Sequence, residues 1–413
     1  MTRDETKTKA GPLAGIKVVE LGSTVAAPFC CRLFADFGAE VIKVEPPDGD
    51  VLRWIGPRED GVGLYGTSIL RNKQLVALDF KRPEALALAR RLAERADIVV
   101  ENFRPGTLER LGLGYEELSK ANPGLVLVRI SGFGQSGPYR GRAGYGVVAE
   151  AMAGVRHMTG DPDRPPSRVG VAMTDQLTAV YAAFAAMMAL RRRDATGRGQ
   201  VVDAALYECS FSLMEPYVPA YEKAGLMPMR AGSGLSDSAP NNLYGTASGG
   251  YVHIAANGDA VFNRLMEAIG RPELAISLHY QTAADRGANK DELDREIAAW
   301  TGRHTAADVE ERLIANGVPA SRVFTMEDIF ADEHYRARDM LPSIPHPTLG
   351  SVMMAGIAPK LSESPGTIRW AGGRIGEHTE AVLRRELGVD RATIARLHGE
   401  KAIVCAEPPA AAD

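Results

Sequence analysis

Residues 16–45, IKVVELGSTVAAPFCCRLFADFGAEVIKVE, contain the pattern from which the fold class is predicted. Its two ends, IKVVEL (16–21) and EVIKVE (40–45), are short runs rich in valine and isoleucine, a composition that favours strands. Between them PFCCRLFADFG (28–38) has a helical pattern with a proline near its start, where the missing N–H costs little. The stretch therefore predicts a strand, a helix and a second strand.

The same alternation continues through the first half of the chain. Further strands are predicted at LVALDF (75–80), DIVVEN (97–102), LVLVRIS (125–131) and VVDAAL (201–206). Further helices are predicted at RPEALALARRLAERA (82–96), TLERLGLGYEELSKA (107–121) and from about Asp175 to Arg192. Strands that alternate with helices indicate an α/β fold with a largely parallel sheet. The last helix is apolar on nearly every face, so we expect it to be buried on most sides.

The length and a change of composition indicate more than one domain. At 413 residues the chain is too long for one ordinary core, and two domains are expected. Residues 227–242 are rich in Gly, Ser, Pro and Asn, which marks a linker or loop. After it, a hairpin is predicted at YGTASGGYVHIAA (244–256), and helices near 259–269, 290–301, 305–316 and 377–398.

The overall composition is that of a soluble globular protein. Apolar residues make up 45% of the chain, charged residues 24%, and the net charge is −4. This balance gives no support to nucleic-acid binding, which calls for a basic excess. The four cysteines have no metal-like spacing, and two are adjacent, so we expect reduced, buried thiols: Cys30, Cys31, Cys209 and Cys405.

Neither end of the chain has a targeting pattern. Residues 1–12 are polar and charged without an apolar core, so they are predicted to be a frayed tail, and residues 406–413 are interpreted in the same way. The longest apolar stretch, Leu177–Leu190, is short of a membrane span. A cytoplasmic location is the expectation.

A glycine motif follows the predicted strand at 125–131. Gly132-x-Gly134-x-x-Gly137 resembles a dinucleotide fingerprint, which requires a helix to begin directly after it. The residues that follow, Pro138-Tyr139-Arg140-Gly141-Arg142, have the character of a loop. We therefore interpret the glycines as a flexible connection between a strand and a helix.

Few residues carry a recognisable catalytic pattern by themselves. HExxH, CxxC, Walker and GxSxG motifs are absent, and His157 and His253 are isolated histidines of the kind that is usually structural. Asp175 differs because it follows SRVGVAMT and opens the long apolar helix. An aspartate there caps free N–H groups, and the residues alone favour this role. The same environment would also hold a carboxylate ionised as a nucleophile.

Several ordered segments of the chain resemble class III coenzyme A transferases, the family of formyl-CoA transferase, carnitine CoA-transferase and, as a divergent branch, α-methylacyl-CoA racemase. The matching segments run from about Gly11 to Glu208 and continue more weakly to Leu387. They are PLAGIKVVELGSTVAAPFCCRLFADFGAEVIKVEPPDGD (12–50), NKQLVALDFKRPEA (72–85), ADIVVENFRPGTLERLGLGYEEL (96–118), ISGFGQSGPY (130–139) and VGVAMTDQLTAVYAAFAAMMALRRRDATGRGQVVDAALYE (169–208).

The resemblance implies that Asp175 is the nucleophile of an acyl-CoA:carboxylate CoA-transferase. No permanently bound cofactor or metal is implied, since coenzyme A and acyl-CoA are substrates. Residues implied to line the coenzyme A site are Thr24, Val25, Ala26, Asn102, Phe103 and Arg110, with Lys73 as a phosphate-binding charge and Tyr145 near the acyl end. The family's site lids suggest Gly232–Gly234 and Gly249–Gly250.

The chain also departs from the family's patterns. Pro46 and Ser23 stand where formyl-CoA transferase has an arginine and a histidine. The racemase branch has a histidine in an AGHD-type segment, whereas here AGYG (143–146) places Tyr145 at that position. Tyrosine is a poor base at neutral pH, which argues against a 2-methylacyl-CoA racemase. An inactive CoA-binding protein is the second alternative.

The substrate is an expectation from three arginines, for which ordinary surface positions are the alternative interpretation, and the architecture is an expectation from the resemblance. Arg140, Arg142 and Arg168 flank segments that would enter the site and could pair with a distal carboxylate, which favours a dicarboxylate acceptor and succinyl-CoA as donor. The family implies a large Rossmann-like domain, a smaller α+β domain and an interlocked homodimer. We place the large, discontinuous domain at 1–226 with 330–413, and the small domain with its linkers at 227–329.

Overall fold

The computed structural model describes residues 11–235 and 238–406, so most of the two predicted tails lies outside the described residues. The chain forms two compact units. The larger one runs up to Ala153 and also contains Gly170–Met214 and the chain from His334 on. The smaller one contains Gly154–Val169 and Glu215–Glu333. We describe each unit by itself.

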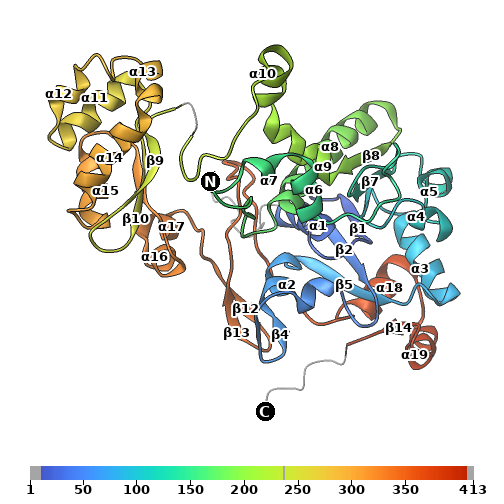
Figure 1. Ribbon diagram of the computed structural model, residues 1–413. Helices are drawn as coiled ribbons and strands as arrows, with labels where there is room; N and C mark the ends of the chain where they lie inside the picture. Colours follow the sequence, from blue (N-terminus) through green and yellow to red (C-terminus); the bar gives the residue numbers. More distant parts are fainter. Residues whose placement is uncertain (1–10, 236–237, 407–413) are drawn as a thin grey trace, which may run out of the picture. The chain divides into compact units, whose positions relative to one another are not determined.

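A seven-stranded sheet is the centre of the larger unit (Figure 1). Its strands are β1 (Lys17–Glu20), β2 (Glu40–Glu45), β5 (Lys73–Leu78), β6 (Ile98–Glu101), β7 (Val126–Ser131), β8 (Val201–Ala205) and β14 (Ile403–Val404). They lie in the order β14-β5-β2-β1-β6-β7-β8, and every pair is parallel except β14 with β5. The predicted α/β unit with a largely parallel sheet is confirmed. The short antiparallel strand β14 had no prediction.

The strand order reverses between β1 and β6. From β1 the chain continues to β2 and β5 on one side, whereas β6, β7 and β8 follow on the other. Loops that leave β1 and β6 at their carboxyl ends therefore diverge and leave a crevice, which is where ligands bind in open α/β sheets. The loop after β1 begins at Leu21, and the loop after β6 begins at Asn102.

Helices surround this sheet. They are α1 (Ala26–Asp36), α2 (Leu64–Ile69), α3 (Pro83–Ala93), α4 (Thr107–Arg110), α5 (Tyr115–Ala121), α6 (Gly146–Met152), α8 (Met173–Thr196), α9 (Leu206–Phe211), α18 (Thr379–Leu387) and α19 (Arg391–Gly399), with 3-10 turns η1 (Val51–Trp54) and η2 (Ser212–Met214). The helix predicted at 107–121 is two helices, because Gly112 between them takes a φ of 66°. Two hairpins complete the unit: β3 (Arg58–Glu59) with β4 (Val62–Gly63), and β12 (Ser343–His346) with β13 (Gly350–Met353).

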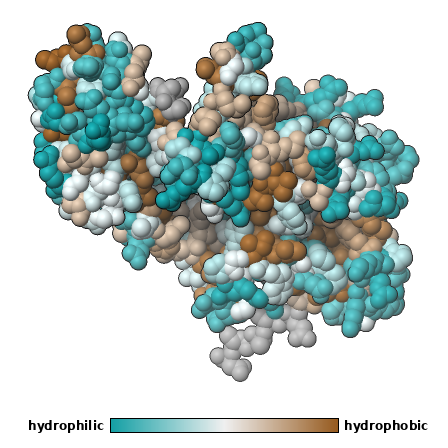
Figure 2. Space-filling model, in the orientation of Figure 1, coloured by the Kyte–Doolittle hydropathy of each residue, from teal (hydrophilic) through white to brown (hydrophobic). Residues whose placement is uncertain are grey.

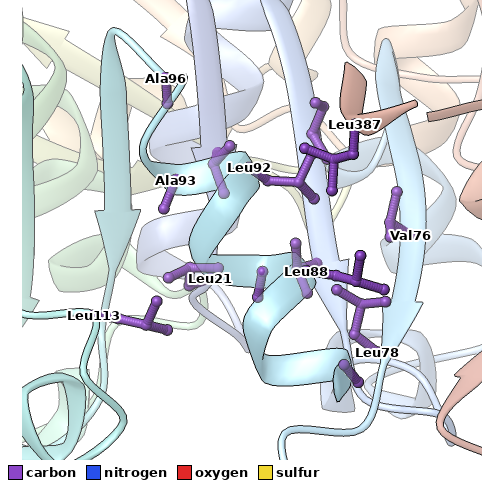
Figure 3. Packing of buried hydrophobic residues seen from close by; sticks show 14 of the residues in the cluster. Leu21, Val76, Leu78, Leu88, Leu92, Ala93, Ala96, Leu113 and Leu387 are labelled. Carbon is purple, nitrogen blue, oxygen red and sulfur yellow. The ribbon is translucent and has the colours of Figure 1, made fainter. Parts of the chain in front are cut away.

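The sheet is buried on both faces. Val19 of β1 belongs to a core that contains Leu88 of α3 and Leu387 of α18, whose packing Figure 3 shows. Its neighbour Val18 faces the other way and belongs to a second core, with Phe34 of α1 and alanines of α8. Successive strand residues point to opposite faces, so neighbouring residues of a strand that is covered on both sides belong to different cores.

Helix α8 is buried on one side only. Its small residues, such as Ala179 and Ala182, pack against the sheet and α1. Phe184 on the opposite side is 62% exposed, and other exposed apolar residues of α8 are Val180, Tyr181, Met187 and Met188. Apolar surface on the larger unit is visible as brown areas in Figure 2. The prediction that α8 is buried on most sides is wrong for a single chain, since the apolar pattern covers more faces than the sheet can bury.

The smaller unit is built around a three-stranded antiparallel sheet in the order β11-β10-β9. The predicted hairpin is confirmed as β9 (Asn241–Gly245) and β10 (Tyr251–Ala255), and β11 (Ala320–Arg322) was not predicted. Its helices are α7 (Val155–Met158), α10 (Tyr217–Ala224), α11 (Asp259–Ala268), α12 (Pro272–Ala275), α13 (Ala283–Ala288), α14 (Lys290–Thr301), α15 (Ala306–Ala315) and α16 (Met326–Ala331); α17 (Glu333–Ala337) begins at the boundary between the units. None of the helices in the described part of the chain has the length and apolar character that a membrane span requires.

Candidate active site

A cavity of about 200 Å³ lies at the carboxyl ends of the central strands of the larger unit. Its walls come from the loops after β1, β6 and β7, from the segment that precedes α6, and from the first turn of α8. Seven of the nine predicted site residues line it together: Thr24, Val25, Ala26, Asn102, Phe103, Tyr145 and Asp175. The cavity is therefore the candidate active site.

Asp175 is the third residue of α8 and does not occupy the capping position. The capping residue is Ala172, which has no side-chain hydrogen bond to the helix. The first turn of a long helix still favours a negative charge, because the free N–H groups and the helix dipole both point there. The half-buried carboxylate lines the cavity.

Gly146, the first residue of α6, lies directly against this carboxylate. A Cβ atom built on Gly146 would be 2.2 Å from Oδ2 and 2.9 Å from Cγ of Asp175. Every residue except glycine would therefore displace the carboxylate. The same AGYG segment approaches the loop after β7, since a Cβ on Gly132 would be 2.9 Å from the Cα of Gly144.

These contacts explain the glycine motif that follows β7. Gly132 is required for close backbone packing, and Gly134 and Gly137 take positive φ angles of 85° and 78°. The next helix begins only at Gly146, so the helix that a dinucleotide fingerprint requires directly after the glycines is absent here. The interpretation of the motif as a strand-to-helix connection fits this geometry.

Asn102 joins the two loops at the strand crossover. Its side-chain oxygen accepts from the N–H of Ser23 at 2.8 Å, and its amide nitrogen donates to the carbonyl of Ser23 at 2.8 Å. Gly22 makes room for this pair, because a Cβ there would be 2.8 Å from the Asn102 oxygen. The backbone N–H of Phe103 donates a hydrogen bond to the Glu101 carboxylate at 2.7 Å, which fixes the backbone at Phe103. Burial raises the pKa of Glu101 against the opposing effect of Arg129.

Two predicted contact residues lie away from the cavity. Lys73 is fully buried, and its ammonium donates to Glu20 at 2.6 Å and to the carbonyl of Pro28 at 2.7 Å. In this structure it is a structural cation that a phosphate does not reach. Arg110 is exposed on α4 and donates to Thr107 at 2.9 Å.

Three arginines give the cavity a positive lining. Arg104 was not predicted, although its position directly after Asn102 and Phe103 could have identified it. Arg140 and Arg142 also line the cavity, and the Arg142 guanidinium lies 3.4 Å from the centroid of the Tyr139 ring. Such a stack orients a guanidinium before a ligand arrives. Arg168 belongs to the smaller unit.

The remaining candidates belong to other surroundings. His157, His253 and both predicted glycine lids are in the smaller unit, where His253 pairs with Asn241 at 3.0 Å. Three of the four cysteines are buried as expected, and Cys405 is half-buried. Burial raises the pKa of all four thiols, which makes them poor nucleophiles. Over residues 11–235 and 238–406, no cluster of His, Cys, Asp and Glu is suited to a metal ion.

Known proteins resemble this chain over almost its whole length. The family model described as CoA-transferase family III matches residues 13–379. A succinyl-CoA–D-citramalate CoA-transferase of Chloroflexus aurantiacus is 45% identical over 95% of this chain and 98% of its own length. A succinyl-CoA:mesaconate CoA-transferase of Haloarcula marismortui is 38% identical over 93% and 98%.

Solved structures of related proteins also resemble this chain. The crystal structure of a CAIB/BAIF family protein from Brucella suis superposes with a TM-score of 0.82 and 34% sequence identity, covering 91% of this chain and all of that one. The resemblance seen in the sequence segments is confirmed by the family match, the relatives and this structure. The chain belongs to CoA-transferase family III and is a CoA-transferase.

Proposed function

We propose that this enzyme transfers coenzyme A from succinyl-CoA to a dicarboxylic acid, with Asp175 as the nucleophile. The observation that carries the proposal is the position of Asp175: its carboxylate lies in the first turn of α8, against Gly146, in a cavity with three arginines. The names of the relatives support the substrate class, since they pair succinyl-CoA with citramalate or mesaconate.

The exchange takes four steps. The Asp175 carboxylate attacks the thioester carbonyl, and the C–S bond breaks to release CoA thiolate and leave a mixed anhydride. The thiolate attacks the aspartyl carbonyl, which frees the donor acid as a carboxylate and leaves an aspartyl-CoA thioester. The acceptor carboxylate then attacks this thioester, and the released thiolate takes the acceptor acyl group from the second anhydride. Asp175 is regenerated without any net proton transfer.

The local structure suits these steps. The first turn of α8 stabilises the carboxylate that begins and ends the cycle. Gly146 lets the backbone approach the carboxylate without a side chain between them, and Asp175 lines the cavity. Thr24, Val25 and Ala26 line the same cavity, and we place coenzyme A against them.

The three arginines divide between two anionic parts of the substrate. Arg142 and Arg140 precede Tyr145 and Gly146 in the chain, so we place the distal carboxylate of the acyl group at them. Arg104 lies beside Asn102 and Phe103, where we place a phosphate of coenzyme A. In this placement Arg104 supplies a positive charge that formyl-CoA transferase has at the position of Pro46.

We further propose that the enzyme is a homodimer, in the interlocked form that the family resemblance implies. The exposed apolar face of α8, with Phe184 at its centre, is continued by Phe211 and Leu213, which are also exposed. Large contiguous apolar patches on a soluble protein mark association sites. We assign this face to a second copy of the chain, because the family resemblance implies a homodimer.

Trapping the covalent intermediate tests the proposal. The enzyme is incubated with succinyl-CoA, treated with borohydride or hydroxylamine, and analysed by peptide mass spectrometry. We expect an adduct on Asp175 and CoA exchange with an acid panel that includes citramalate, mesaconate, malate and glutarate. Asp175→Ala should lose the adduct and at least about a thousandfold in rate. Asp194→Asn, at the exposed far end of the same helix, should retain both.

Absence of the adduct in the native enzyme, together with no exchange for any acid, would overturn the proposal. Loss of the α-proton of an enantiopure 2-methylacyl-CoA to D₂O would indicate racemase chemistry instead. Tight coenzyme A binding without any turnover would identify an inactive CoA-binding protein.

A further inference from the structure

A network of buried charges lies directly behind the Thr24 wall of the cavity. The Lys43 ammonium is 2.6 Å from Asp50 Oδ2 and 3.0 Å from Glu20 Oε1, and it also donates to the carbonyl of Gly22. Lys43, Asp50 and Glu20 have no more than 1% exposed side chain. A cluster of this kind is expensive to bury, so its geometry is tightly constrained.

The sheet register fixes the position of the cluster. Glu20, the last residue of β1, is the register partner of Lys43 in β2, and its other oxygen binds Lys73 of β5 at 2.6 Å. The backbone of Asp50 is also fixed, because its N–H donates to the Glu45 carboxylate at 2.9 Å. Lys43 therefore cannot move without breaking its pairs with Glu20 of β1 and with Asp50.

Thr24 is the residue that this cluster reaches in the cavity wall. Its φ of 70° is in the left-handed region, which β-branched residues avoid. Its N–H donates to Asp50 Oδ1 at 2.9 Å, and the same oxygen accepts from Leu52 at 2.9 Å. A strained residue persists only where its surroundings over-determine it, and here the Asp50 carboxylate supplies the constraint.

The ionised form of the Asp50 carboxylate is stabilised by the groups around it. Burial by itself would raise the pKa of Asp50, but the Lys43 ammonium and the N–H groups of Leu52 and Thr24 outweigh burial and lower it. The pKa of Lys43 is likewise above its usual value, because Glu20 and Asp50 outweigh the effect of burial. Both groups are therefore charged at neutral pH.

We propose that Asp50, anchored by Lys43, is a positioning residue of the coenzyme A site: it holds Thr24 in its strained conformation and thereby sets the wall formed by Thr24, Val25 and Ala26. The inference rests on the proposed function, since it names this wall as the coenzyme A wall. Asp50 itself is fully buried and touches no substrate. Without its carboxylate, Thr24 relaxes toward negative φ and the wall changes shape.

The test compares Asp50→Ala with a matched control, Asp36→Ala. Asp36 is equally buried and binds Arg71 through two hydrogen bonds of 3.0 and 2.6 Å, but it is the last residue of α1, at the opposite end from the cavity. Both variants should be less stable. Only Asp50→Ala should weaken coenzyme A binding measured by titration calorimetry, by about tenfold or more, with KM for succinyl-CoA rising in parallel and kcat changing less.

A second variant protects the test against misfolding. Asp50→Asn keeps the shape and one acceptor oxygen, so it should fold and show the same effect at smaller size. Folded Asp50 variants that bind coenzyme A as the native enzyme does, or an Asp36→Ala that binds equally weakly, would overturn the inference.

Failure of the proposed function has a different signature. In that case the native enzyme itself shows no coenzyme A binding and no adduct on Asp175. If the native enzyme binds coenzyme A and forms the adduct, only the behaviour of the Asp50 variants decides the positioning role.

Discussion

The Cα atom of Gly146 lies against the carboxylate of Asp175, so that a Cβ on Gly146 would be 2.2 Å from Oδ2. The two residues are 29 positions apart and start different helices, α6 and α8. This contact makes the position of the proposed nucleophile depend on the absence of a single methyl group.

Gly146→Ala should therefore impair catalysis far more than stability. The new methyl group displaces the carboxylate from its position, and a small misplacement of a nucleophile reduces the rate by on the order of 100-fold. Steady-state kinetics with succinyl-CoA measures the loss, and the melting temperature reports stability. Gly141→Ala, where a Cβ meets nothing within 4 Å, is the control and should retain full activity. An unchanged kcat in Gly146→Ala would contradict the prediction.

Arg142→Leu should change the choice of acid. Its guanidinium is stacked on Tyr139 and lines the cavity, so its removal leaves a distal carboxylate without its partner. We expect KM for a dicarboxylate acceptor to rise by about tenfold or more, since a charged hydrogen bond is lost. KM for a monocarboxylate of the same length should stay within about threefold. Arg164→Leu, a mostly exposed arginine of the smaller unit, is the control. Equal effects on both acids would show that Arg142 does not read the second carboxylate.

Phe184→Asp should separate the proposed dimer into single chains. Phe184 is 62% exposed on α8 in the single chain, and a carboxylate there would be desolvated by a second copy. Sedimentation velocity should give the mass of a dimer for the native enzyme and a shift toward the monomer for the variant. Lys120→Glu, an exposed charge reversal on α5, should leave the mass unchanged. A monomeric native enzyme would refute the homodimer.

The stability of the enzyme in acid should depend on Asp50. Its pKa is lowered in the folded state, so the unfolded chain binds its proton more readily, and stability rises with pH through this window. The contribution is present above the ordinary pKa of about 3.9 and is lost as the pH falls through the lower, folded value. The difference in urea midpoint between the native enzyme and Asp50→Asn should accordingly be larger at pH 7 than at pH 3. An equal difference at both pH values would show that the Asp50 charge contributes nothing.

Much of the fold could be predicted because its signals are local. The prediction for the strand at 40–45 is correct to the residue, and that for 125–131 differs by one position, because both are short runs rich in valine and isoleucine. The helix predicted at 107–121 is too long, because a single glycine such as Gly112 does not by itself end a helical pattern. Its positive φ, which ends the helix, is visible only in the structure. The domain boundaries placed at 226 and 330 stay a prediction.

Sequence alone identified the family, singled out Asp175, and placed seven of the nine predicted site residues correctly in its cavity, because these belong to ordered segments whose spacing is visible along the chain. Three features of the site and its surroundings follow only from the tertiary structure. It buried Lys73 in an ion pair with Glu20, brought Arg104 into the cavity, and left Phe184 exposed on α8. Each of these outcomes depends on which strands are neighbours in the sheet and on how much surface it can cover. The sequence shows Asp175 only as a carboxylate at the start of a helix. Its contact with Gly146, which constrains the carboxylate, exists only in the folded chain.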